Sequence, residues 1–288
     1  MLSSNDKLPR SFGDEYDNHI IFDEIKIIQD FYEALSYCNI SFIENAAFMS
    51  DAKIFSTSTY IYSSIEGTFE SISVLLHNGR CNDAFALVRK YCDSIVLDIY
   101  KNILSKQIDK EYYESLTSEA IKNNKIKQWI DAESRLFEER EIINVYKTIK
   151  QEYPELTKLF NLTDKSTLYH KLREICNDNM HYNYLYTMMA NDASMIRSRK
   201  DLWMPLLKSM ARAIRLFFSI HFSFIYVGNP GNMMSSDYMD YLDCGMQPPP
   251  GCERWVPNPV QIAFSSIIQK YTPKISKYLL SLDLMDLE

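Results

Sequence analysis

The residues with the clearest chemical potential lie in one short stretch, Cys176-Asn177-Asp178-Asn179-Met180-His181, with Arg173 just before it. An imidazole such as that of His181 is suited to proton transfer because its unperturbed pKa lies near neutrality. A guanidinium is suited to phosphate because its planar fork donates two hydrogen bonds at once. These residue types within a few positions of each other make the stretch the strongest candidate for a reactive site.

The elements that must position these residues are predicted to be helices. Apolar side chains recur at intervals of three and four residues through most of the chain, which is the period of a helix with one buried face. A polar loop is expected over residues 191–199, and a short turn over 155–162. The pattern predicts helices over 19–49, 52–76, 83–104, 112–127, 134–152, 163 through the reactive stretch, 201–227, 259–271 and 273–284.

Two of these helices are expected to form an antiparallel pair. His77-Asn78-Gly79 is a stop signal, because glycine readily adopts the left-handed conformation at a helix C-terminus. Asn82 or Asp83 is the expected N-cap of the next helix, after a short loop. The predicted fold class is therefore all-α, an antiparallel helical bundle with extra helices.

Three segments are expected along the chain. Residues 1–18 are polar and are predicted to form a flexible N-terminal arm, and residues 19–232 hold the bundle. Residues 233–288 contain Gln247-Pro248-Pro249-Pro250-Gly251, which fits neither a helix nor a central strand. We expect this Pro-rich segment to be an ordered strap that packs on the bundle with the last two helices. A docking motif for a partner is the alternative.

Composition excludes several classes of protein. The chain has only 7 glycines and lacks both the Gly-x-Gly-x-x-Gly and the Gly-x4-Gly-Lys-Ser/Thr patterns, so a nucleotide-binding sheet enzyme is disfavoured. It also lacks Gly-x-Ser-x-Gly, which argues against a serine hydrolase. The net charge of −7 disfavours non-specific wrapping of nucleic acid, although it permits contact at one small site.

Cysteine and histidine spacing predicts neither a metal nor a cofactor. None of the 6 cysteines forms Cys-x-x-Cys, and the 5 histidines do not stand at metal-ligand spacing from them. The first residues are polar and the longest apolar run covers 216–227, which is too short to cross a bilayer. We therefore expect a cytoplasmic protein with free thiols and no membrane partner.

The stretch around His181 resembles the motif of the HEPN superfamily, small helical-bundle domains common in bacterial toxin–antitoxin and phage-defence systems. The family motif is an arginine, a polar residue, a short spacer and a histidine. Asn177 matches the polar position and His181 the histidine, whereas Cys176 stands where the family has its arginine. The run containing Arg89 is similar to an arginine-bearing helix of the family, and the resemblance covers about residues 50–230.

This resemblance implies a metal-independent endoribonuclease, in which a ribose 2′-hydroxyl attacks the adjacent phosphate. It implies that His181 moves the proton, that Asn177 orients the reacting groups, and that Arg173 or Arg89 stabilises the phosphate. RNA is then the substrate, and the partner is a second copy in a homodimer or a protein encoded in the same operon. Both arginines have an ordinary alternative as salt-bridged groups, since Asp93 and Glu174 lie near them in the sequence.

A basic cluster follows the reactive stretch. Arg197, Arg199 and Lys200 are expected to hold RNA phosphates near His181. The alternative is a solvated helix start, with Asp201 as the N-cap.

Two other functional hypotheses remain open on the sequence. The first is a catalytically inactive HEPN-like bundle that acts as a protein-interaction or regulatory module. The second is an unrelated helical scaffold, in which His181 only caps a carbonyl at a helix end.

Overall fold

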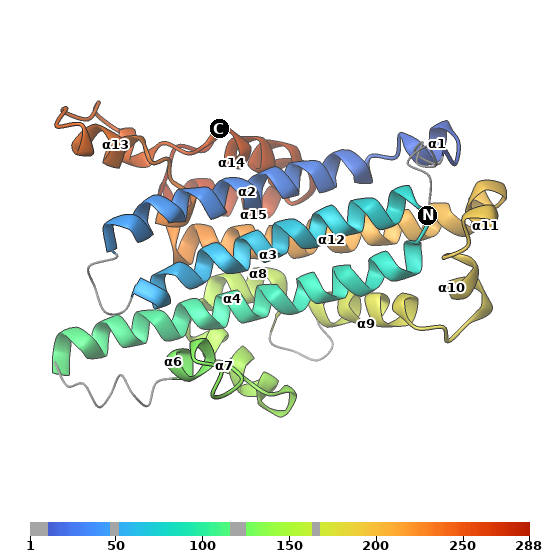
Figure 1. The fold of residues 1–288 in the computed structure, drawn as a ribbon, viewed down its shortest axis with the longest axis horizontal. Coiled ribbons are helices and arrows are strands. Elements are labelled where there is room, and N and C mark those ends of the chain that lie inside the picture. Colours follow the sequence, from blue (N-terminus) through green and yellow to red (C-terminus); the bar gives the residue numbers. More distant parts are fainter. Residues whose placement is uncertain (1–10, 47–51, 116–124, 163–167) are drawn as a thin grey trace, which may run out of the picture.

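The computed structural model describes residues 11–46, 52–115, 125–162 and 168–288, and no strand occurs among them. Four long helices run side by side along the molecule (Figure 1) and form its body. The prediction of an all-α bundle is confirmed. The four are α2 (Ile21–Ala46), α3 (Ala52–His77), α4 (Cys81–Ser115) and α12 (Lys200–Gly228).

The α3–α4 pair forms as predicted, because the turn between the helices is closed by glycine. Gly79 adopts φ +68°, in the left-handed region that favours glycine. The amides of Gly79 and Arg80 donate to the carbonyls of Leu76 and Leu75, both at 2.9 Å. This return of the chain places α4 beside α3 in the opposite direction (Figure 1).

The start of α4 is capped from a distant part of the chain, and the expected cap by Asn82 or Asp83 is wrong. The helix begins at Cys81, so both residues lie in its first turn. Their backbone amides donate to Oδ1 of Asn191, at 3.0 and 3.2 Å, and the amide of Cys81 donates to the carbonyl of Ala190 at 3.0 Å. The segment just before residue 192 is therefore fixed to the first turn of α4.

Helix α12 is the central helix of the bundle, and its predicted extent is confirmed. It carries fully buried aromatic side chains, of which Phe218 and Phe222 pack against Phe31 of α2, and Phe217 packs against Tyr91 of α4. Among the described helices it alone is long and apolar enough to cross a membrane by length and composition. However, 78% of its most apolar window is buried inside the bundle, as in a core helix.

A polar network lies in the centre of this apolar core. His221 on α12 is fully buried, with Nε2 at 3.0 Å from Oδ2 of Asp98 and Nδ1 at 2.6 Å from the hydroxyl of Tyr32. Because a carboxylate only accepts, Nε2 donates to Asp98, and in the neutral ring Nδ1 accepts from Tyr32. The Tyr32 hydroxyl then accepts from Tyr91 at 2.8 Å. The network joins α2, α4 and α12 through directional bonds.

The middle of the chain differs from the prediction. Helix α4 runs to Ser115, so the helix expected over 112–127 is wrong in its first part, and residues 116–124 lie outside the described residues. The helix expected over 134–152 is shorter. The elements here are α6 (Lys125–Ile130), a 3-10 turn (Glu139–Glu141), α7 (Ile142–Glu152) and α8 (Pro154–Phe160), which begins at its proline.

The loop expected over 191–199 is also wrong. After α9 (Leu168–Met180), the chain forms two short helices, α10 (Leu185–Met189) and α11 (Ala193–Ser198). Helix α11 starts at an aspartate N-cap, because Oδ1 of Asp192 accepts from the amide of Ser194 at 2.8 Å. The predicted helix start at 163–166 lies outside the described residues.

The expected flexible arm does not extend over residues 11–18. Helix α1 (Asp14–Asp17) lies here, and Phe12 and Tyr16 are both buried. The hydroxyl of Tyr16 donates to the carbonyl of Leu76 at 2.8 Å, which anchors this segment to the end of α3. Residues 1–10 lie outside the described residues.

The C-terminal segment packs on the bundle through its last helices. Helices α14 (Asn258–Ala263) and α15 (Pro273–Leu282), with a π-helical turn (Phe264–Gln269) between them, contact α2 and α12. The strap before them is ordered by Arg254, which pairs with Asp283 and Asp286. Its short helix α13 (Asp237–Asp243) has no buried side chain and lies at the opposite end of the molecule from α10 (Figure 1).

Candidate functional site

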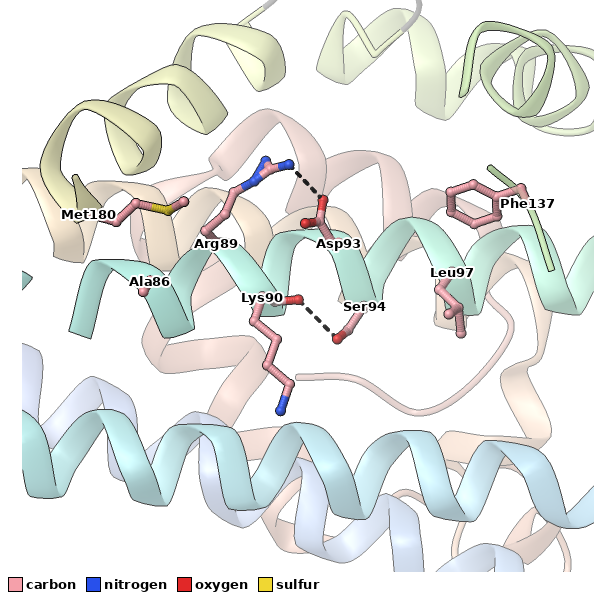
Figure 2. Close-up of a pocket in the computed structure, with 8 residues that line it drawn as sticks. All are labelled: Ala86, Arg89, Lys90, Asp93, Ser94, Leu97, Phe137 and Met180. Carbon is pink, nitrogen blue, oxygen red and sulfur yellow. Dashed lines mark hydrogen bonds and ion pairs between the residues drawn. The ribbon is translucent and has the colours of Figure 1, made fainter. Parts of the chain in front are cut away.

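Helix α9 carries the predicted reactive stretch and packs against the first half of α4. This contact brings two of the candidate residues together on one carboxylate. Nη2 of Arg89 lies 3.2 Å from Oδ1 of Asp93, one turn further along α4 (Figure 2). Nη2 of Arg173, from α9, lies 3.7 Å from the same oxygen. Arg89 and Arg173 therefore converge from two helices at Asp93.

The carboxylate of Asp93 does not satisfy all the hydrogen-bond donors of the two guanidinium groups. The side chains of Arg89 and Arg173 are 12% and 23% exposed, whereas that of Asp93 is 53% exposed. Nη1 of Arg89 and Nε of Arg173 are buried and have no hydrogen-bond partner among the described residues. Two positive charges share one negative charge, so this position can attract an anion.

Arg89 and Asp93 line a shallow groove of about 430 Å³ along α4, whereas Arg173 is not among its lining residues. Figure 2 shows Arg89 and Asp93 extending from α4 toward α9, while Lys90 extends to the other side of the helix. Met180, the last residue of α9, lies at one end of the groove. The groove is lined by Ala86, Arg89, Lys90, Asp93, Ser94, Leu97, Phe137 and Met180.

Cys176, which stands at the arginine position of the motif, is fully buried at this helix contact. Burial raises the pKa of its thiol to about 12, outweighing the nearby charge of Arg89, which lowers the pKa. The thiol is therefore protonated at neutral pH and is neither a nucleophile nor a phosphate ligand. An arginine at this buried position would stand beside Arg89 and next to Arg173, which gives a physical reason for a small neutral residue here.

His181 directly follows the last residue of α9 and is exposed. Within the part of the chain that the structure describes, its imidazole makes no hydrogen bond or ion pair, so the cap suggested as its ordinary role is not seen. The end of α9 is instead satisfied by Asn82, whose Nδ2 donates to the carbonyl of Asn179. His181 is thus exposed and directly follows Met180, which lines the groove, but it is not itself a lining residue.

The side chain of Asn177 is half-buried and has no hydrogen-bond partner among the described residues. Its predicted orienting role stays a prediction.

The basic cluster does not join the arginine pair. Arg199 binds Asp201 at 2.6 Å, Lys200 binds Glu15 at 2.5 Å, and Nη2 of Arg197 donates to the carbonyl of Ser11 at 3.3 Å. The N-cap of α12 is Arg199, so the expected cap by Asp201 is wrong. Helix α10 lies between α9 and this cluster (Figure 1). The RNA-binding role of Arg197, Arg199 and Lys200 stays a prediction.

Sequence reasoning missed two features of the molecule. The sequence indicates Asp93 only as a partner of Arg89, because its second partner Arg173 depends on how α9 packs on α4. His221 carried a signal, since a histidine inside the apolar run 216–227 indicates a buried polar contact.

Among the described residues, no three His, Cys, Asp or Glu side chains are grouped so as to hold a metal ion. Comparison of the chain with family models, with curated proteins and with solved structures finds no match.

Proposed function

We propose that this chain is an HEPN-like, metal-independent endoribonuclease of a bacterial defence or toxin-type system, with its site at the α4–α9 groove. The observation that carries the proposal is the convergence of Arg89 and Arg173 on Asp93, where α9 packs on α4. The two arginines supply the positive charge that Cys176 does not. His181, exposed directly after the last residue of α9, supplies the proton transfer.

The reaction needs only these groups and RNA. The imidazole of His181 accepts the proton of a ribose 2′-hydroxyl, and the 2′-oxygen forms a bond to the adjacent phosphorus. The bond from phosphorus to the 5′-oxygen of the next nucleotide breaks, and that oxygen takes the proton from the imidazole. The products are a 2′,3′-cyclic phosphate and a 5′-hydroxyl end. The guanidinium of Arg89 or Arg173 stabilises the charge that builds on the phosphate oxygens.

A second candidate function is favoured by the carboxylate of Asp93. Because this carboxylate engages both arginines, the groove also fits a catalytically inactive bundle, in which the same charges hold α9 on α4. Such a protein would act as an interaction or regulatory module for a second copy or an operon-encoded partner.

Expression in a bacterial host separates the two candidates. Wild type is expected to slow growth and to fragment RNA, and the purified protein to cleave RNA in the presence of EDTA. His181→Ala should abolish both effects. His170→Ala is the matched control, because His170 is a partly exposed histidine on the same helix. If the wild type leaves RNA intact, the ribonuclease proposal is wrong. If the His181→Ala variant still cleaves RNA, the assignment of the site is wrong.

A further inference from the structure

A cluster of exposed aromatic side chains directly follows His181. Tyr182, Tyr184 and Tyr186 are 59%, 56% and 41% exposed. The rings of Tyr184 and Tyr186 lie parallel, with 5.4 Å between their centroids and 10° between their planes. Leu185 and Met188, on the same short helix, are also exposed. Large rings usually lie in the core, so this concentration on the surface requires an explanation.

The segment that carries these rings is held in place by buried neighbours. Tyr184 has extended backbone and is the N-cap of α10, and its carbonyl accepts from the hydroxyl of Thr187 at 2.6 Å. Thr187 is itself buried. Asn191, which caps α4, also donates to the hydroxyl of Tyr182 at 3.2 Å. The exposed rings are therefore part of an anchored structure and not the side chains of a loose loop.

The position of the rings relates them to the arginine groove. Tyr184 is three positions after His181, so their Cα atoms lie at most about 11 Å apart. Met180, just before His181, lines the groove that contains Arg89. A strand with one phosphate beside His181 therefore has its neighbouring bases within reach of Tyr184 and Tyr186.

We propose that Tyr184 and Tyr186 form a stacking platform for the bases of single-stranded RNA; this inference rests on the proposed function. Every base has a π-face that stacks on an aromatic ring, so such a platform holds RNA without reading its sequence. Paired RNA keeps its bases stacked on each other and cannot use it. The platform thus makes unpaired RNA the substrate and complements the phosphate contacts of Arg89 and Arg173.

The test uses a fluorescent RNA of about 12 nucleotides with 2′-O-methyl riboses, a length within the range of single-stranded sites. This probe lacks the attacking hydroxyl, so it reports binding without cleavage. Relative to wild type, Tyr184→Leu/Tyr186→Leu is expected to weaken binding by roughly 10- to 100-fold. Tyr184→Trp/Tyr186→Trp keeps the rings and should bind at least as well as wild type. Tyr60→Leu is the matched control, because Tyr60 is 72% exposed on α3.

The proposal is overturned if the wild type does not bind the probe, or if the Leu and Trp double variants bind it equally. The proposal is also overturned if the Leu double variant binds RNA like wild type but no longer self-associates in light scattering. The tyrosines would then form a contact between copies of the chain. The proposed function fails separately. If the wild type binds the probe through its tyrosines but does not cleave unmodified RNA, the stacking platform is supported and the ribonuclease proposal is contradicted.

Discussion

At the scale of single residues, Cys176 stands where the motif of the proposed family has its arginine. The structure gives this residue a packing role at the contact of α9 with α4, and it brings Arg89 and Arg173 to the same place from two helices. The identities of His181, Arg89 and Arg173 were predictable from the sequence as candidates. Their convergence on Asp93 was not, because it depends on the packing of two helices that are far apart in the chain.

Asp93 is expected to oppose the binding of phosphate. In Asp93→Asn, both guanidinium groups lose their counter-charge, so the affinity for the 2′-O-methyl RNA should rise by roughly fivefold, about 1 kcal/mol. The free energy of unfolding should fall by about 1 kcal/mol, because Asp93 is a half-exposed partner of both arginines. Fluorescence anisotropy and urea denaturation measure the two effects. Weaker binding in this variant would mean that the arginines need Asp93 to hold them in position.

The thiol of Cys176 is expected to be unreactive in the folded protein. With its pKa raised to about 12, roughly one thiol in ten thousand is ionised at pH 8. Alkylation with iodoacetamide, followed by peptide mass spectrometry, should modify exposed Cys244 rapidly and Cys176 only after unfolding. Cys244→Ser is the control that removes the rapid signal. Fast labelling of native Cys176 would contradict its burial between α4 and α9.

At the scale of elements, the spacing of apolar residues predicts the helices. It does not predict the residues that cap the helices or the contacts that connect them. The extents of α2, α3 and α12 and the α3–α4 turn were predictable, because local stripes and a local glycine determine them. The cap of α4 by Asn191 was not, since that residue lies more than 100 positions later. The short helices α10 and α11 were missed for a related reason: five or six residues are too few to show a period, and the residues between the two helices are fixed by distant contacts with α4.

Asn191 is expected to stabilise both α4 and the segment that carries the tyrosines. Asn191→Ala removes the acceptor for two backbone amides of α4 and should lower the free energy of unfolding by about 1–2 kcal/mol. Hydrogen exchange should speed up at the first turn of α4 and in α10. Asn232→Ala is a suitable control, because Asn232 also donates from its side chain to a tyrosine hydroxyl. Unchanged exchange in α10 would show that other contacts fix the segment.

Asp98 is expected to make the joint between α4 and α12 sensitive to acid. Burial raises the pKa of this carboxyl, but the hydrogen bond from His221 and the charge of Lys101 outweigh burial and hold it below its ordinary value. Because the pKa of Asp98 is lower in the folded state than in the unfolded state, its carboxylate contributes fully to the free energy of unfolding above about pH 4. This contribution is lost as the pH falls through the folded-state pKa.

Asp98→Asn should therefore lower the free energy of unfolding at neutral pH by about 3–5 kcal/mol, because it leaves Lys101 buried without its counter-charge. Below about pH 4, the stability of this variant should fall less steeply than that of wild type. Urea denaturation across pH measures both effects, with Asp240→Asn on exposed α13 as the control. Parallel acid profiles for wild type and Asp98→Asn would contradict this role.

At the scale of the whole molecule, the candidate site and the Pro-rich strap lie at opposite ends of the bundle (Figure 1). The groove, His181 and the tyrosines belong to α4, α9 and α10, while the Pro-rich strap lies at the other end (Figure 1). The fold class was predictable because composition and period exclude a sheet. The placement of the strap was not, since an extended proline-rich segment has no period that indicates what it packs against.

The cleavage rate of one unpaired RNA in EDTA, with Arg89→Ala compared with wild type, tests the central claim most directly. If Arg89 stabilises the phosphate in place of the motif arginine, the rate should fall roughly 100- to 1,000-fold, as for a lost oxyanion donor. Arg140→Ala, which removes an arginine that is 82% exposed elsewhere, should cleave like wild type. Equal rates for Arg89→Ala and wild type would contradict the account, because the groove would then take no part in the reaction.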